Sequence, residues 1–106
     1  MKRADMFPGR FLRATDLDGH APIVTIARVD LTNIGGTLKP VVYFVGKDRG
    51  MVLNKTNAAA IELITGELDT DRWAGRRIRL TTQDVDFQGK RVPAIRVVDP
   101  GPPTAP

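Results

Sequence analysis

The chain has 106 residues, of which 42% are hydrophobic and 26% are charged, with a formal net charge of +4. That length fits one domain with a modest core, and the basic balance favours a polyanionic partner. The absence of cysteine excludes disulfides, cysteine-based zinc sites and thiol nucleophiles, and a single histidine, His20, leaves little for a catalytic triad or a metal site.

The first half of the chain predicts three strands. Residues 21–31 are rich in β-branched side chains, which is typical of a strand. Gly35 and Gly36 then mark a turn before a second strand at 38–46. The sequence KDRG predicts a tight turn, followed by a short third strand at 51–54.

The pattern then changes to a short helix of about ten residues, because alanines replace β-branched residues and apolar residues recur at helical spacing. Asn54 or Thr56 is expected to cap its N-terminus, and Gly66 to end it. A fourth strand is expected from Arg76, and a fifth over residues 90–98.

The element order is therefore β-β-β-α-β-β, a mainly β domain over residues 1–98. Five strands with one helix between the third and fourth is the order of the OB-fold, a small, partly open Greek-key barrel, and an SH3-like barrel is the main rival. The first ten residues are expected to be loosely held. The last eight, 99–106, include four prolines and predict a disordered tail.

The last two strands predict a hairpin with a two-residue turn at Gln88 and Gly89. This turn places Phe87 opposite Lys90, and alternation then sorts the side chains between two faces. The expected core face carries Ile78, Leu80, Thr82, Ile95 and Val97, and the expected wet face carries Arg77, Arg79, Thr81 and Arg96.

At the tip of this hairpin the pattern reverses. The core-side positions hold the charged residues Asp84, Asp86 and Arg91, and the solvent-side positions hold Val85, Val92, Phe87 and Lys90. Either the ribbon twists or bulges near Gln83 and folds back, or the tip projects and presents Phe87 and Lys90 to a ligand. An exposed aromatic stacks on nucleobases, whereas in the alternative Phe87 packs against its two valine neighbours.

Other candidate contacts follow from the strand pattern. Tyr43 and Phe44 are consecutive, so one enters the core and the other, expected to be Tyr43, lies on the outer surface. Trp73 is expected to plug the core. The candidate nucleic-acid contacts are Tyr43, Phe87, Lys90, Arg28, Lys39, Lys47, Arg49, Lys55, Arg77, Arg79 and Arg96.

No catalytic constellation, phosphate-binding glycine loop, metal site or cofactor site is predicted, so we expect a protein that is not an enzyme. No stretch has the roughly 18–20 apolar residues of a membrane span, and no signal-peptide core is present, so we expect a cytoplasmic protein. The leading hypothesis is binding of single-stranded DNA, with RNA as an open alternative. The second is a protein-interaction adaptor or inhibitor, and a third, less favoured, is a structural virion component. The oligomeric state is left open.

Three segments, VVYFVGKDRGMVLNKTNAAAI, DRWAGRRIRL and DFQGKRVPAIRVV, resemble a family of small bacteriophage and prophage proteins that are encoded near replication or recombination genes. The resemblance covers roughly residues 11–98 and implies an OB-like domain that acts on single-stranded DNA, with phage replication or recombination proteins as partners. It carries over no contact residues. The C-terminal sequence DPGPPTAP lacks the acidic, phenylalanine-tipped end of bacterial single-stranded DNA-binding proteins.

Overall fold

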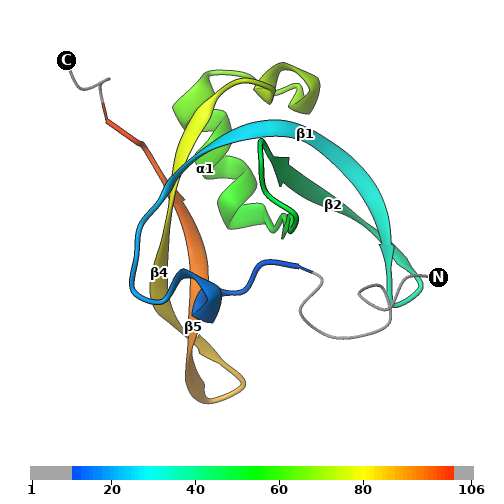
Figure 1. Ribbon diagram of the computed structural model, residues 1–106. Coiled ribbons are helices and arrows are strands. Elements are labelled where there is room, and N and C mark those ends of the chain that lie inside the picture. The colour runs from blue at the N-terminus through cyan, green and yellow to red at the C-terminus, as the bar shows by residue number, and fades with distance from the viewer. Residues whose placement is uncertain (1–10, 102–106) are drawn as a thin grey trace.

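The computed structural model describes residues 11–101 and contains one five-stranded antiparallel sheet and one α-helix (Figure 1). The expected order of five strands, with the helix between the third and fourth, is confirmed. Two short 3-10 helices, η2 and η3, were not expected. The elements are η2 (Ala14–Leu17), β1 (Ile23–Ile34), β2 (Thr37–Phe44), β3 (Met51–Val52), α1 (Lys55–Thr65), η3 (Thr70–Trp73), β4 (Arg77–Phe87) and β5 (Lys90–Val98). The predictions for residues 1–10 and for the last five residues of the tail lie outside the described range.

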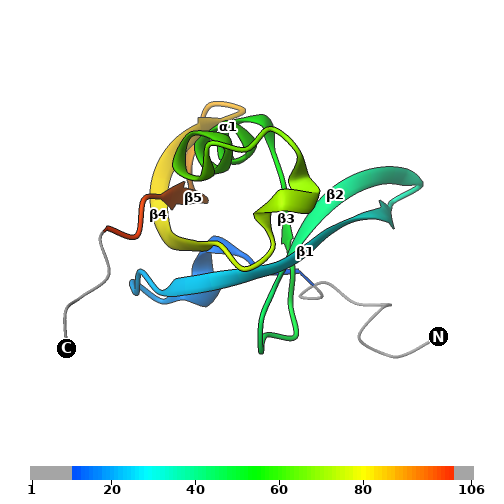
Figure 2. The same ribbon diagram turned by 90° about the horizontal axis from the view of Figure 1, so that it is seen from above.

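The strand order across the sheet is β3-β2-β1-β4-β5, so β1 is central and β3 and β5 form the two edges. The sheet is open, because these edges do not pair with each other, and Figure 2 shows α1 between them. β1 serves both halves of the sheet: residues 23–25 pair with β4, and residues 26–34 pair with β2. Between the halves, Ile26 faces Phe44 and Arg28 faces Tyr43, so Ala27 is the extra residue of a β-bulge. Such a bulge bends a strand, and here it lies where β1 passes from its pairing with β4 to its pairing with β2.

The β1–β2 and β4–β5 hairpins project from the molecule in different directions (Figures 1 and 2). Each has a two-residue turn whose residues both have positive φ: 60° and 87° at Gly35 and Gly36, 51° and 78° at Gln88 and Gly89. This is the combination that a type I′ turn requires. The predicted register of the β4–β5 hairpin is confirmed pair by pair, from Phe87 opposite Lys90 to Leu80 opposite Val97.

Helix α1 begins and ends where its cap residues predict. The Asn54 side chain accepts a hydrogen bond of 2.8 Å from the backbone N–H of Asn57, so Asn54 is the N-cap rather than Thr56. Gly66 closes the C-terminus in the left-handed conformation, and its N–H donates to the carbonyl of Glu62. Within residues 11–101, no helix has both the length and the apolar character needed to cross a membrane.

The core lies between the sheet and α1, and it confirms two predictions from the sequence. Phe44 is buried while its neighbour Tyr43 is half-buried on the outer face of β2. Trp73 is only 1% exposed, and its indole N–H donates to the carbonyl of Glu67 at 3.0 Å. The expectation that Thr82 belongs to the core is wrong, because the β4–β5 hairpin leaves the domain at that level and its side chain is exposed. The other four predicted core residues of this hairpin are buried: Ile78, Leu80, Ile95 and Val97.

Other groups satisfy part of each sheet edge. On β5, the side-chain amide of Asn57 donates to the carbonyl of Ile95 at 3.0 Å and accepts from the N–H of Val97 at 3.3 Å. Asn57 therefore makes the two bonds that a neighbouring strand would make. Beside β3, the N–H of Leu12 donates to the carbonyl of Gly50 at 2.9 Å. At these positions the backbone groups of the edge strands are already hydrogen-bonded and are not available to pair with another strand.

Candidate nucleic-acid interface

The outer face of the β4–β5 hairpin carries charge of one sign. Alternation places every second residue of each strand on this side, opposite to the buried Ile78 and Leu80. The carboxylates Asp84 and Asp86 fall on the other side. We call this surface the ribbon face. Its residues are Arg77, Arg79, Thr81, Gln83, Val85 and Phe87 from β4, and Lys90, Val92, Ala94, Arg96 and Val98 from β5, so it has four cations and no acid.

The four cations of the ribbon face are free of carboxylate partners. In the part of the chain that the structure describes, the ion pairs are Arg28–Asp30, Arg49–Asp16 and Arg91–Asp86, and none includes a ribbon-face residue. Arg79 donates to the carbonyl of Ala21 at 2.7 Å, and Arg96 donates to that of Ile95 at 3.0 Å. Bonds to neutral carbonyls hold these side chains in place without cancelling their charge.

The tip of the hairpin projects, as one of the two interpretations of its sequence proposed. The β4–β5 register continues to the turn without a bulge, and Phe87 is 60% exposed. Val85 and Val92 lie opposite each other one step behind it and are half-buried. Phe87 therefore keeps most of its surface in solvent, next to the exposed Lys90.

The outer surface continues from the ribbon face across β1. Arg77 lies opposite Thr25 of β1, and Arg28 follows Thr25 by three residues. In a regular strand these two side chains would point to opposite sides, but the extra residue of the bulge puts both on the outer side. Three residues of strand span about 10 Å. Arg28 thus extends the line of cations beyond Arg77. We call the ribbon face together with Arg28 the outer basic face; Phe87 lies near one end of it and Tyr43 near the other.

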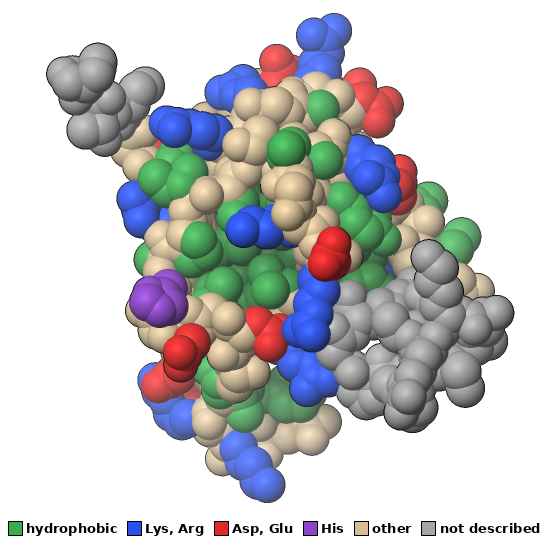
Figure 3. All heavy atoms as spheres, in the orientation of Figure 1, with side chains coloured by type: hydrophobic (Ala, Val, Ile, Leu, Met, Phe, Trp, Pro, Cys, Tyr) green, Lys and Arg blue, Asp and Glu red, His purple; other side chains and the backbone are tan. Residues whose placement is uncertain are grey.

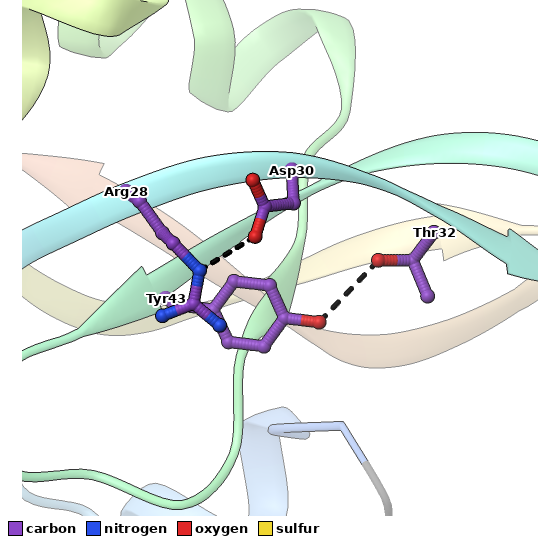
Figure 4. Close-up of polar contacts among 4 residues, drawn as sticks. All are labelled: Arg28, Asp30, Thr32 and Tyr43. Carbon is purple, nitrogen blue, oxygen red and sulfur yellow. Dashed lines mark hydrogen bonds and ion pairs between the residues drawn. The ribbon is translucent and has the colours of Figure 1, made fainter.

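At the Tyr43 end the side chains form one connected group (Figure 4). The guanidinium carbon of Arg28 lies 4.3 Å from the centroid of the Tyr43 ring, within the range of a cation–π contact. The Nε of Arg28 donates to Asp30 at 2.5 Å, and the Tyr43 hydroxyl lies 3.3 Å from that of Thr32. Gly50 backs the ring: a Cβ atom there would come within 3.0 Å of Tyr43 and 2.5 Å of Val41. The ring is therefore covered on one face and closely approached at its edge.

The remaining predicted contacts do not belong to one groove. Lys39 is exposed and shares the outer side of the β1–β2 hairpin with Tyr43. Lys47 and Arg49 lie in the turn between β2 and β3, and Arg49 pairs with Asp16 at 3.3 Å. Lys55 is the exposed first residue of α1. The structure thus brings Arg28, Tyr43 and the β4–β5 residues onto one outer surface, and places Lys47, Arg49 and Lys55 elsewhere.

The sequence did not predict the cavity beside Lys47 and Arg49, or the role of Asn57. The cavity measures about 340 Å³, and apolar side chains line most of it, including Leu17, Val24 and Phe44. Figure 3 shows hydrophobic side chains in the hollow of this face, with charged side chains of both signs around them. Residues from four separate segments meet here, so no local pattern indicated it. The signal for Asn57 was a polar residue, poor in helix propensity, in an alanine-rich helix.

Comparison with protein-family models, with curated protein sequences and with solved structures found no match. The resemblance to small phage proteins therefore stays a prediction. What is known of the interface is its geometry: an outer surface with five cations, an exposed phenylalanine near one end and an arginine stacked on a tyrosine near the other.

Proposed function

We propose that this protein is an OB-fold-like protein that binds single-stranded DNA along its outer basic face and acts in phage DNA replication or recombination. Phosphates lie on the cations of this face, and bases stack on its exposed flat side chains. Binding of this kind is largely independent of sequence, because every base has a π-face.

The fold supports this proposal. The order β-β-β-α-β-β and the strand neighbours β3-β2-β1-β4-β5 match a five-stranded OB-fold whose last closing contact is open. OB-folds bind oligonucleotides across strands two and three, with the loops between the first and second strands and between the fourth and fifth strands as walls of the site. The tip at Phe87 is the second of these loops, and the ribbon face continues from it along β4 and β5.

The single observation that carries the proposal is the charge on the ribbon face. Alternation puts four cations on one side of β4–β5 and leaves Asp84 and Asp86 on the other, although the chain as a whole has 12 acidic residues. A surface that only contacts solvent does not require its cations and carboxylates to be on separate sides. A surface that binds a strand of phosphates does, because cations attract the phosphates and nearby carboxylates repel them.

A salt titration tests the proposal. Fluorescence anisotropy of labelled oligo(dT) should show binding at low salt and a linear fall of log K with log salt concentration. If each ribbon-face cation neutralises one phosphate, the slope is about −3, since a single-strand contact contributes roughly −0.7. Absence of binding at the lowest salt concentration would overturn the proposal, because the phosphate contribution is largest there.

Two neighbouring residues give a matched control. Lys90 lies on the ribbon face, whereas Arg91 lies on the opposite side and contacts Asp86 at 3.8 Å. Both lose one positive charge when replaced by glutamine. Lys90→Gln should reduce the magnitude of the salt slope by roughly 0.7, and Arg91→Gln should leave it unchanged. Equal effects would mean that net charge alone, not this face, attracts the strand. Parallel titrations with duplex DNA and with RNA identify the preferred nucleic acid.

The alternative function, a protein-interaction module, is favoured by one observation, the apolar cavity of about 340 Å³. Binding by strand addition receives less support, because Asn57 occupies the β5 edge at Ile95 and Val97. Phe87→Ala separates the two functions, since it should weaken DNA binding and leave a partner held in the cavity unaffected.

A further inference from the structure

The Tyr43 ring does not offer a free stacking surface. One of its faces lies under the guanidinium of Arg28, at 4.3 Å from the centroid, and its hydroxyl contacts Thr32. The backbone at Gly50 approaches the ring edge so closely that a Cβ atom there would be 3.0 Å from Cδ1 and Cε1. A base that approached this site along the outer surface would meet Arg28 before it met Tyr43.

Arg28 is held as a flat, oriented group. The Tyr43 ring lies on one side of the guanidinium, and Asp30 accepts a hydrogen bond from Nε (Figure 4). The two contacts together restrict the rotation of the guanidinium plane. Its side chain is nevertheless 59% exposed. Guanidinium planes stack on unpaired bases in the same manner as aromatic rings, and they add a cationic attraction.

We propose that the outward face of the Arg28 guanidinium is a base-stacking platform, and that Tyr43 is a positioning residue beneath it. The ligand is a nucleobase of the same single strand whose phosphates follow the ribbon face, so the inference rests on the function proposed above. Arg28 lies about three strand residues beyond Thr25, the partner of Arg77, so a strand that passes Arg77 reaches it next. The base, Arg28 and Tyr43 then form three stacked layers.

Arg28→Lys tests the platform, because it keeps the positive charge and removes the plane. Wild type and variant are titrated with two labelled strands of about 12 nucleotides, one oligo(dT) and one with abasic sites throughout, which keeps the phosphates and lacks the bases. We expect Arg28→Lys to weaken oligo(dT) binding about tenfold with an unchanged salt slope. On the abasic strand the two proteins should bind equally.

Each outcome decides a separate point. If wild type binds oligo(dT) and Arg28→Lys binds it equally well, the platform is excluded and the proposed function stands. An equal loss on both strands would make Arg28 a phosphate contact and would also exclude the platform. If wild type does not bind oligo(dT) at low salt, the proposed function itself fails.

Tyr43 is tested by its conservative variant. Tyr43→Phe keeps the ring under Arg28 and loses only the contact with Thr32, so it should bind oligo(dT) as wild type does. Tyr43→Leu removes the ring and should reproduce the oligo(dT) loss of Arg28→Lys without any loss on the abasic strand. Melting temperatures establish that both variants are folded. If Tyr43→Leu is folded and binds normally, Tyr43 does not position Arg28.

Discussion

The two hairpins of this protein have the same construction and opposite surfaces. Both have a two-residue turn with positive φ at both positions, and both extend beyond the core. On the outer side of β1–β2, Arg28 and Tyr43 are engaged with Asp30 and Thr32. On the outer side of β4–β5, four cations have no carboxylate partner among the described residues, two of them exposed and two half-buried. The charge of Arg28 is thus paired within the protein, whereas no described carboxylate pairs with the four cations of the ribbon face.

The inner sides of the hairpins differ as well. Beyond the core, β1–β2 turns Leu31 and Leu38 inward, and these remain 68% and 62% exposed. The corresponding positions of β4–β5 hold Asp84, Asp86 and Arg91. The comparison teaches that a hairpin outside the core is not a neutral extension: its two faces differ in composition, and of the four faces the outer side of β4–β5 gathers four cations without a carboxylate among them.

The largest loss of stability is expected at Asn57, the residue of α1 whose side chain is hydrogen-bonded to β5. Asn57→Ala removes both bonds to β5: it leaves the N–H of Val97 without that partner, while the carbonyl of Ile95 keeps only the bond from Arg96. The unsatisfied N–H costs roughly 1–3 kcal/mol and the lost bond to Ile95 about 0.5–1.5 kcal/mol, so we expect a loss of about 2–4 kcal/mol in the free energy of unfolding. Urea unfolding measures it. Lys55→Ala, on the exposed first turn of the same helix, is the control and should change stability by less than about 0.5 kcal/mol.

On the β1–β2 side, the backbone at Gly50, just before β3, packs closely against Val41 and Tyr43 of β2. Gly50→Ala brings a methyl group to 2.5 Å from Cγ1 of Val41, which is fully buried. Overpacking of this kind costs about 1–3 kcal/mol, again measured by urea unfolding. The double variant Gly50→Ala, Val41→Ala should recover part of the loss relative to the sum of the single variants. Simple additivity would show that the contact is not the cause.

A third prediction separates binding from folding at the β4–β5 tip. Phe87→Ala should weaken oligo(dT) binding about tenfold, because one base loses its stacking partner. The melting temperature should change little, since Phe87 is 60% exposed. A marked fall in melting temperature with unchanged binding would mean that Phe87 packs on Val85 and Val92 instead.

The smallest effect is expected where charge is already paired. Asp30→Asn removes the carboxylate beside Arg28, an ion pair whose side chains are 59% and 50% exposed. Exposed pairs contribute about 0.2–1 kcal/mol, so stability should fall by no more than that. Affinity for oligo(dT) should rise by a small factor, because a negative charge leaves the outer surface. A fall in affinity would show that the carboxylate orients Arg28 in a way that an amide oxygen does not replace.

Much of the fold was predictable because local signals agreed with each other. The turn at Gln88 and Gly89 fixed the β4–β5 register, and alternation then assigned four of its five core residues correctly. Thr82 failed because alternation gives the side of a strand but not the point at which the core ends. Asn54 and Gly66 marked the helix for the same local reasons.

The candidate site was less predictable, because it depends on which strands become neighbours. Arg28 and Arg77 are 49 positions apart in the chain, and only the pairing of β1 with β4 brings them close. The bulge at Ala27 and the stacking of Arg28 on Tyr43 depend on a second pairing, that of β1 with β2. The sequence placed three further cations near the second and third strands: Lys47, Arg49 and Lys55. The first two lie in the turn between β2 and β3 and the third begins α1, so none of them is on the outer basic face.

The bulge at Ala27 has a consequence for how the chain tolerates changes in length. Deletion of one residue elsewhere in β1 would exchange the inward and outward side chains of everything beyond it, since the side-chain period of a strand is two. Deletion of Ala27 would not, because Ile26 would stay inward and Arg28 outward in an unbroken alternation. Natural one-residue deletions in such chains should therefore be accepted at this position and rejected on either side of it.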